Sequence, residues 1–427
     1  MEHMDLAARN HCLLKLYSLA WRIAIPSLYV SPRIRAGWRQ RLLKGYSGGQ
    51  VDLWIQASSG GEAYLALEIL SALAVEGFPR VLVTSGTTQG LDILKKGIEG
   101  IDESRRTSIR ITSFPFDGPG LMDRALRQWS PRTMVLLETE LWPGLMAACT
   151  KHGVPMVILN GRLSKKSFKA YRCLRGFWRD VRPERVLAVS PGDRDRYCAL
   201  FGEQGVQMMH NIKFDRMRID AIIDQSPVAG MIPRGGPFLV MGSVRKEEEK
   251  DVVEVLQSVI KAIPETISAL FPRHMHRLPA WKRSLNRAGL RWTLRSGIKG
   301  DVPRGSIILW DVFGELSSAY AVAQAAFVGG TLRPLGGQNF LEPLGQGVIP
   351  CIGPYWEHFA WVGEEIVQRG LVRQVANSRE LMDCLVKSLK EPPPRQEVLE
   401  RARDYVDKRR GGTETACRTI NAYLGGA

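Results

Sequence analysis

The sequence predicts an α/β protein with two Rossmann-like domains, each built on a parallel sheet, that face one interdomain cleft. The 427 residues exceed what a single hydrophobic core usually holds. Short apolar runs alternate with segments of helical periodicity, which favours parallel sheets covered by helices on both faces. This alternation stops at a Pro- and Gly-rich stretch, 225–237, and then restarts. The restart indicates a second domain.

Each series contains six predicted strands. In the first series they cover 51–58, 80–85, 108–114, 133–139, 155–161 and 185–190. In the second they cover 238–244, 266–274, 306–312, 325–331, 348–354 and 371–375. The charged stretch 395–424 predicts a closing helix. We therefore expect one domain over 47–225 and another over 226–427 that includes this C-terminal helix, with ligands beyond the carboxyl ends of the strands.

Residues 1–46 predict a basic amphipathic segment that associates with a membrane. The run LLKLYSLAWRIAIPSLYV at 13–30 is interrupted by Lys15, Arg22 and Pro26, whereas a spanning helix needs about 20 apolar residues. Residues 1–46 hold eight Lys or Arg against two Asp or Glu, which favours a helix on an anionic leaflet. The alternative is an amphipathic helix packed on the body of the protein.

Charge and cysteines restrict the partners. The formal net charge of +16 admits nucleic acid, an anionic membrane or acidic substrates. The seven cysteines contain no C-x-x-C, so we expect neither a metal cluster nor a disulfide framework, and a reducing cytosolic setting. We also expect no metal at D-R-D, 193–195, which is typical of a helix start. We also expect no metal site at His274 and His276, because a third metal ligand is missing nearby in the sequence.

The stretch GGTLRPLGGQNFLEPLGQGVIPCIGP at 329–354 combines glycines with a short polar insertion. Glycines allow close approach of backbone to a ligand, and free N–H groups at a helix start favour phosphate. Asn339 and Glu342 lie three residues apart, on one side of the predicted first turn. A structural role is equally compatible with this pattern, because Asn is a good N-cap.

Eight motifs in order resemble the transferases of 3-deoxy-D-manno-octulosonic acid (Kdo), which have the GT-B architecture. They are WIQASSGGE ending at residue 62, VTSGTTQG at 83–90, ETELWP at 138–143, NGRLSKKS at 160–167, NIKFD at 211–215, FPRH at 271–274, FGEL at 313–316 and GGQNFLEP at 336–343. They span roughly residues 50–360, and ETELWP and N-x-R-L-S are the most specific. The chain departs from the usual family residues by having Gln56 and Gln338 for His, Gly60 for Val and Phe313 for Met.

The resemblance implies an inverting, metal-independent transfer of Kdo from CMP-Kdo to a lipid A precursor, without a cofactor. Glu62 matches the general base, and a carboxylate there would remove the proton of an acceptor hydroxyl. Its alternative role is that of a first-turn glutamate favoured by the helix dipole. Glu138 and Lys213 match positions that support the transition state. Glu140, two residues further on, is the alternative to Glu138.

The resemblance also implies binding positions in both domains. Those on the donor side are Pro272, Arg273, Phe313, Gly314, Glu315, Asn339, Phe340, Leu341 and Glu342. Those on the acceptor and membrane side are Gly60, Gly61, Arg162, Ser164, Lys165 and Lys166. An arginine can bind phosphate in bidentate fashion.

The segment 160–185 has nine Lys or Arg against two acidic residues, with aromatic residues between them. Such a pattern fits nucleic acid or anionic headgroups. No nucleic-acid motif accompanies it, so we favour a lipid surface at the cytoplasmic face of a bacterial inner membrane. The alternative functions are a GT-B transferase or epimerase acting on a UDP-sugar, and a non-catalytic basic protein that binds membranes or nucleic acid.

Overall fold

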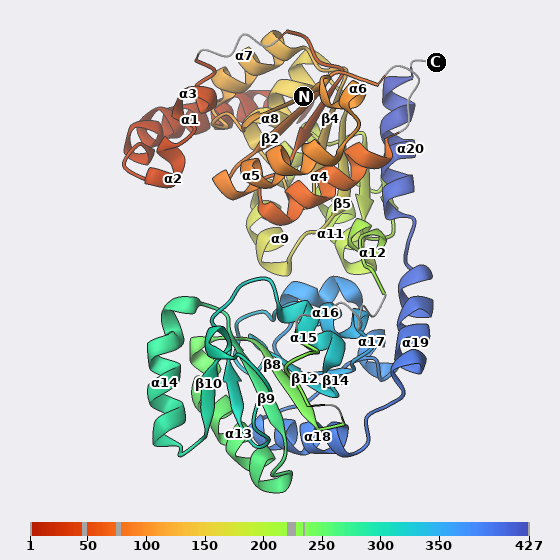
Figure 1. The fold of residues 1–427 in the computed structure, drawn as a ribbon. Coiled ribbons are helices and arrows are strands. Elements are labelled where there is room, and N and C mark those ends of the chain that lie inside the picture. Colours follow the sequence, from red (N-terminus) through yellow and green to blue (C-terminus); the bar gives the residue numbers. More distant parts are fainter. Residues whose placement is uncertain (1, 45–48, 74–77, 220–227, 234, 426–427) are drawn as a thin grey trace. The chain divides into compact units, whose positions relative to one another are not determined.

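The computed structural model describes residues 2–44, 49–73, 78–219, 228–233 and 235–425. These residues form two compact units (Figure 1), one of residues 1–216 with 409–427 and one of residues 217–408. The predicted domain boundary at residue 225 lies outside the described residues, as does the start of the predicted linker, 225–237.

The first unit is built on a seven-stranded sheet in the order β3-β2-β1-β4-β5-β6-β7, with every pair parallel. Its strands are β1 Leu53–Gln56, β2 Val81–Ser85, β3 Ile109–Ser113, β4 Thr133–Leu137, β5 Met156–Gly161, β6 Arg185–Ala188 and β7 Val206–Met208. The central strands are buried along their whole length, because helices cover both faces. Two apolar clusters, one on each face, form the core.

Thirteen described helices belong to this unit. They are α1 Glu2–Leu28, α2 Pro32–Arg35, α3 Trp38–Arg41, α4 Gly60–Ala72, α5 Thr88–Gly97, α6 Glu103–Arg106, α7 Pro119–Trp129, α8 Pro143–His152, α9 Lys165–Tyr171, α10 Arg175–Asp180, α11 Pro191–Phe201, α12 Ile212–Asp215 and α20 Gly412–Leu424. Ser, Thr and Asn side chains cap several N-termini, including those of α4, α5 and α9. The D-R-D stretch lies in α11, where Ser190 accepts the N–H of Asp193, as a helix start predicts.

The second unit repeats the architecture, with sheet order β10-β11-β9-β8-β12-β13-β14 and parallel pairing throughout. Its strands are β8 Phe238–Val244, β9 Ile267–Pro272, β10 Trp292–Leu294, β11 Ile307–Leu309, β12 Ala325–Val328, β13 Pro350–Ile352 and β14 Arg373–Gln374. Its helices are α13 Glu249–Ala262, α14 Leu278–Arg287, α15 Leu316–Val322, α16 Leu341–Gly345, α17 Glu365–Gln368, α18 Ser378–Lys390 and α19 Arg395–Asp407.

The C-terminal stretch differs from the single closing helix that the sequence predicts. It forms two helices, α19 and α20, separated at Gly411, whose φ of +99° suits glycine. The adjacent Gly412 approaches the carbonyl of His210 so closely that a Cβ would clash with it. Ala416 and Ile420 of α20 then pack into the core of the first unit. The last helix therefore belongs to the first unit, not to the second.

Two cysteines lie together in the second unit. Cys351 of β13 and Cys384 of α18, 33 residues apart, form a disulfide, whereas the cysteine spacing predicted no disulfide framework. The pairing arises because α18 packs on β13, which sequence spacing alone does not reveal. Cys12, Cys149, Cys173, Cys198 and Cys417 are free.

Helix α1 has two different faces. Leu13 and Leu14 pack against the core of the first unit, and the Tyr17 hydroxyl donates to Asp117 at 2.9 Å. Leu16 and Ile23, on the opposite face, are 63% and 70% exposed. The helix therefore packs on the body of the first unit, as the alternative interpretation expects, and also presents apolar side chains outward. Its association with a membrane stays a prediction. Among the described residues, no helix combines the length and the apolar character that crossing a membrane requires.

Candidate active site

The site in the first unit lies at the carboxyl ends of β1 and β4. Strand β1 pairs in parallel with β2 on one side and with β4 on the other. The order in which the chain adds strands to the sheet therefore reverses between β1 and β4. Sheets of this kind bind ligands at such a reversal. The loop after β1 contains Ser58 and Ser59, and the loop after β4 contains Glu138 and Glu140. All the carboxylates described next come from these two loops and the start of α4.

Glu62 is the third residue of α4 and closes a capping box with Ser59. Its Oε2 accepts the backbone N–H of Ser58 at 2.5 Å and that of Ser59 at 3.3 Å, and its Oε1 accepts the Ser59 hydroxyl at 3.0 Å. The helix-start role considered as the alternative is therefore real. This capping role does not exclude a catalytic role, because a carboxylate has about four positions that can accept hydrogen bonds. The bonds to Ser58 and Ser59 also fix the orientation of the Glu62 side chain.

Burial gives Glu62 the properties of a base that works near neutral pH. The residue is 8% exposed, and burial, together with the nearby charges of Glu140 and Glu138, raises its pKa to about 7. Glu140 is equally buried. Its Oε2 accepts hydrogen bonds from the Ser58 hydroxyl, from Trp142 Nε1 at 2.5 Å and from Gln56 Nε2 at 3.2 Å. Ser58 thus connects the two carboxylates.

This arrangement predicts a pH effect at Glu140. Replacing Glu140→Gln removes a negative charge that raises the pKa of Glu62, so the pKa of Glu62 falls and the base form persists to lower pH. We expect the acid limb of kcat/KM to move down by about half to one pH unit. The measurement is a pH profile beside Glu68→Gln, a control on the same helix that pairs with Arg216. An acid limb identical in both variants would contradict the coupling.

Glu138 and Lys213 form an ion pair. Lys213 Nζ lies 2.6 Å from Glu138 Oε1, and Arg162 lies 3.7 Å from the other oxygen. Glu138 has a φ of +56°, an uncommon conformation for a residue other than glycine and one that clusters at functional sites. The buried Asn160 accepts the N–H of Ile212 at 2.9 Å and thereby positions the short helix α12 that carries Lys213. The structure thus joins two residues that the sequence separates by 75 positions.

The other positions predicted on the acceptor side have mixed roles. Gly61 is exposed, and a Cβ there would meet only the Ser59 hydroxyl oxygen, at 3.8 Å, so this face of the α4 start is open. Gly60 instead packs against α5, where its Cβ would lie 3.1 Å from Ile93. Ser164 caps α9 by accepting the N–H of Ser167 at 3.0 Å. Its neighbours in the first turn, Lys165 and Lys166, are exposed.

In the second unit the predicted donor residues follow β9 and β11. Pro272 ends β9 and is buried, whereas Arg273 is exposed just beyond it. Phe313 is 81% exposed and Gly314 has a φ of +88°, so this loop presents an aromatic ring and open backbone. The Glu315 side chain serves the fold, since its carboxylate binds Arg295 through two bonds of 2.8 and 2.9 Å. Contacts with a ligand at 315 therefore fall to the backbone.

The glycine-rich loop after β12 is filled by a carboxylate of the protein itself. Glu248, which is fully buried, accepts the N–H groups of Gly330, Thr331 and Leu332 at 2.6, 3.0 and 2.9 Å. These groups form the kind of anion-binding turn that the glycines predict. Their anion is Glu248, so a donor phosphate has to bind elsewhere.

The Asn-Phe-Leu-Glu insertion divides into inner and outer residues. Asn339 is exposed and accepts the N–H of Leu341 at 3.3 Å. Phe340 is fully buried against Trp356, and Leu341 is 7% exposed, so the contacts of these two with a donor are limited to the backbone. Glu342 is half-buried, and burial raises its pKa. Asn339 and Glu342 are thus the side chains left for ligand binding.

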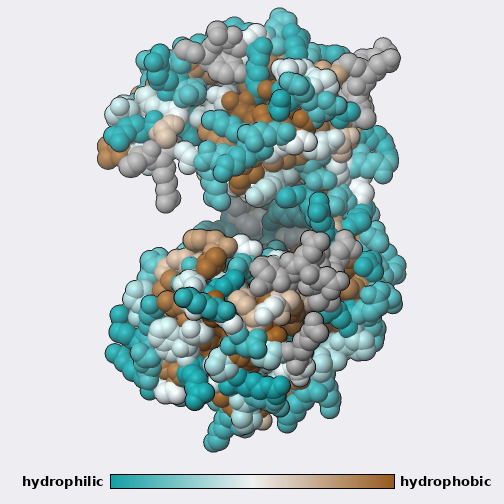
Figure 2. All heavy atoms as spheres, viewed as in Figure 1, coloured by the Kyte–Doolittle hydropathy of each residue, from teal (hydrophilic) through white to brown (hydrophobic). Residues whose placement is uncertain are grey.

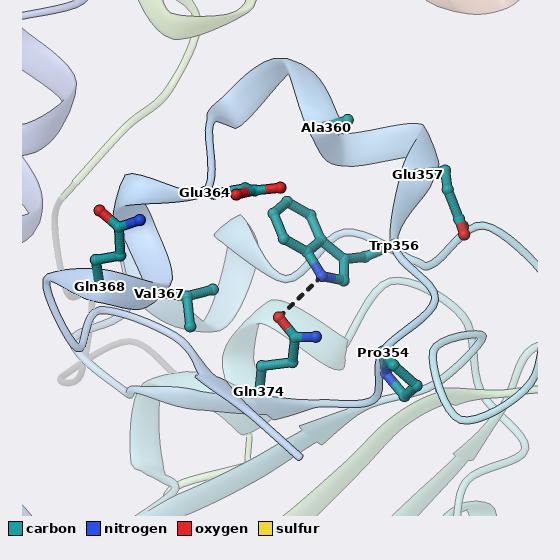
Figure 3. Close-up of a pocket in the computed structure, with 8 residues that line it drawn as sticks. All are labelled: Pro354, Trp356, Glu357, Ala360, Glu364, Val367, Gln368 and Gln374. Carbon is teal, nitrogen blue, oxygen red and sulfur yellow. Dashed lines mark hydrogen bonds between the residues drawn. The ribbon is translucent and has the colours of Figure 1, made fainter. Parts of the chain in front are cut away.

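A cavity of about 500 Å³ lies beside this loop (Figure 3), lined by residues that include Trp356, Glu357, Glu364 and Gln374. The Trp356 indole donates to Gln374 at 3.3 Å across one wall. Two glutamates line it, and none of its eight described lining residues is basic. It is therefore poorly suited to a cytidylate. None of the predicted donor residues lines it.

Sequence reasoning missed two residues of these sites, Ser58 and Glu248. Ser58 lies inside the motif that ends at Glu62, and Glu248 is one acid in a run of three. The run Ser-Ser-Gly-Gly-Glu after a strand is a capping-box pattern and is a signal for Ser59. No local pattern marks Glu248, because its partners lie 82 to 84 residues away.

The chain is similar to known proteins in both sequence and fold. Residues 36–216 match the sequence model of 3-deoxy-D-manno-octulosonic-acid transferase. A 3-deoxy-D-manno-octulosonic acid transferase of Bordetella pertussis is 30% identical over 383 residues, 87% of each chain. One from Haemophilus influenzae is 24% identical and covers 92% of this chain and 93% of its own.

A solved glycosyltransferase from Rickettsia africae has a TM-score of 0.57 at 10% sequence identity, covering 89% of this chain and all of its own. At that identity it supports the two-domain fold alone. The predicted α/β GT-B architecture is confirmed by this likeness and by the two parallel sheets. The identity and coverage of the Bordetella relative establish the family: the chain belongs to the 3-deoxy-D-manno-octulosonic acid transferase family.

Proposed function

We propose that this chain transfers Kdo from CMP-Kdo to a hydroxyl of a lipid A precursor, with inversion at the anomeric carbon and without a metal. Family membership supports the sugar and the class of reaction. The observation that carries the proposal is the buried Glu62 carboxylate, which has a pKa of about 7. It lies where the strand order of the first sheet reverses, between β1 and β4.

The chemistry is a single displacement. The acceptor oxygen forms a bond to the anomeric carbon of Kdo, the bond from that carbon to the phosphate oxygen breaks, and CMP leaves with the electron pair. The hydroxyl proton passes to Glu62, which therefore has to be ionised beforehand. One displacement inverts the configuration. The Ser58 and Ser59 N–H groups hold the carboxylate in place, so little reorganisation precedes proton transfer.

The Glu138–Lys213 pair supplies fixed charge beside this base. Lys213 is a cation held by a short ion pair at the same end of the sheet. In a site with little water, such a preorganised cation stabilises negative charge far better than it does in bulk solvent. The Kdo carboxylate and the departing phosphate both carry that charge, so Lys213 acts on the transition state.

The second unit offers groups suited to a cytidylate. Arg273 is exposed at the carboxyl end of β9, and a guanidinium binds phosphate in bidentate geometry. The Phe313 ring is exposed for stacking on a base. The Glu342 carboxylate, which makes no ion pair within the described residues, is suited to accept hydrogen bonds from ribose hydroxyls.

The direct test combines purified protein, CMP-Kdo and a tetraacylated lipid A precursor, with the product mass recorded. We expect one or more Kdo increments, and no change when EDTA is added. The competing function is transfer or epimerisation of a UDP-sugar. Turnover of UDP-N-acetylglucosamine without turnover of CMP-Kdo would reject our proposal.

Helix α1 supports attachment to the membrane that contains such an acceptor. Figure 2 shows hydrophobic atoms at the surface of the end of the first unit formed by α1 and α2. Leu16, Leu19 and Ile23, spaced three and four apart, are 53% to 70% exposed, and Lys15 and Arg22 accompany them. Apolar and basic side chains on one helix face favour an anionic lipid surface.

Replacing Leu19→Asp should therefore weaken binding to anionic vesicles. The change puts a negative charge into the apolar stripe while the side chain stays in solvent when the protein is unbound, so folding is preserved. We expect the fraction that co-sediments with phosphatidylglycerol vesicles to fall about fivefold or more. Met208→Asp, at an apolar side chain of β7 that is 44% exposed, is the control. Equal losses in both variants would refute a specific role for α1.

A further inference from the structure

A second cavity, of about 260 Å³, lies in the first unit between the N-terminal helices and the ends of the strands. Trp21, Leu28 and Ile34 form its apolar side, together with Phe116. Its opposite side includes Ser58 and Trp142, the residues that bind the Glu62 and Glu140 carboxylates. Its volume lies just below the usual range for small-molecule pockets, which suits one part of a larger ligand.

Arg41 is the unusual residue of this cavity. The side chain is 7% exposed, yet it forms no ion pair within the part of the chain that the structure describes. Its Nη1 and Nη2 donate to the carbonyls of Phe114 and Gly86 at 3.1 and 2.9 Å. Its Nε has no hydrogen-bond partner among the described residues. The Phe116 ring, 5.9 Å away, supplies a weak cation–π contact.

A buried charge without a counter-ion is costly, and burial lowers the pKa of Arg41. A guanidinium stays charged in proteins, so the cost persists until an anion approaches. Asp117 also lines the cavity, but its carboxylate already accepts N–H groups of Gly144 and Leu145 at 2.8 and 2.7 Å and the Tyr17 hydroxyl. Asp117 therefore serves the start of α8 and the attachment of α1.

We propose that this cavity binds the phosphate-bearing, acylated part of the acceptor lipid. Arg41 binds the phosphate, and the apolar side formed by Trp21, Leu28 and Ile34 contacts the acyl chain. The inference rests on the proposed function and names the substrate class that its acceptor site selects. It differs from the acceptor residues expected from the sequence, which lie at the start of α4, after β5 and on α9.

Two observations connect this cavity to the reaction. Ser58 contributes both to the cavity wall and, through its N–H, to the orientation of Glu62, so a lipid held here has its sugar next to the base. The apolar side includes Trp21 and Leu28 of α1, and the outer face of this helix carries the exposed stripe of Leu16, Leu19 and Ile23. A lipid partly withdrawn from a membrane under α1 therefore finds apolar contacts on its way to the base.

The test is a comparison of two acceptors in detergent micelles. One is the tetraacylated lipid A precursor with its phosphates, and the other is the same lipid after phosphatase treatment. For the wild type we expect KM to rise at least about tenfold when the phosphates are removed, with kcat little changed. For Arg41→Gln we expect a similar KM on both acceptors and an unchanged KM for CMP-Kdo. This pattern isolates the pairing of Arg41 with phosphate.

Arg124→Gln is the matched control, because Arg124 is exposed and donates to the carbonyl of Leu42 at 3.0 Å. It should discriminate between the acceptors as the wild type does. If Arg41→Gln fails to fold, Ile34→Trp tests the inference instead, because the larger side chain fills the cavity from α2. We expect this variant to raise the KM for the phosphorylated lipid about tenfold. Equal discrimination in wild type and Arg41→Gln, or a normal KM in Ile34→Trp, overturns the inference. Absence of Kdo transfer by the wild type overturns the proposed function instead.

Discussion

Glu62→Gln is expected to reduce kcat/KM for Kdo transfer about a thousandfold, within the range that removal of a general base produces. Glutamine keeps the shape of the side chain and can still complete a capping box with Ser59, so the start of α4 should remain folded. The loss should therefore appear in kcat, with the KM values for both substrates nearly unchanged. Steady-state kinetics with mass detection of the product measure it.

The pH profile gives this prediction a second, independent check. Burial raises the pKa of Glu62 to about 7, so the wild-type base is mostly protonated at pH 6 and mostly ionised at pH 8. The kcat/KM of the wild type should fall about tenfold per pH unit below 7, whereas the residual activity of Glu62→Gln should lack this limb. A thermal melt within about 2 °C of wild type would exclude unfolding as the cause. Retention of more than a tenth of the activity would show that another group takes the proton.

The sequence predicted most of the fold because its strands are buried on both faces. The twelve predicted strands correspond to β1–β6, β8, β9 and β11–β14, and most of them have strong apolar runs, with the two-residue edge strand β14 as an exception. Two short strands at the sheet edges were missed, β7 at 206–208 and β10 at 292–294. Met208 is 44% exposed and all of β10 is only partly buried, so neither strand shows the apolar pattern that marks the central ones.

The placement of two site residues was predictable, because Glu62 and Glu138 follow β1 and β4, whose carboxyl ends lie at one edge of a parallel sheet. Lys213 follows β7, which the sequence missed, and its pairing with Glu138 appears only in the structure. Arg41 and Glu248 were not predictable, because their partners lie 45 to 84 residues away and depend on how loops pack. The same limit explains why Glu315 and Phe340, which a motif places in the donor loop, have side chains committed to the fold.

Lys213→Met is expected to lower kcat about a hundredfold or more, because removal of one fixed group that stabilises transition-state charge costs that much in comparable sites. The variant also leaves Glu138, whose side chain is 14% exposed, with the more distant Arg162 as its one cationic partner among the described residues. We therefore expect a loss of stability of about 1–3 kcal/mol as well. Chemical denaturation and single-turnover kinetics on the same sample separate the two effects.

The double variant Glu138→Gln/Lys213→Met decides between a structural and a catalytic role for the pair. Removing both charges eliminates the unpaired carboxylate, so most of the lost stability should return. If the pair only supported the fold, activity would return with it. We expect the opposite: the double variant should stay at least a hundredfold below wild type, because the cation that we propose stabilises transition-state charge is still missing. Recovery of activity in parallel with stability would reduce Lys213 to a structural partner of Glu138 and leave Glu62 as the only catalytic group on this sheet edge.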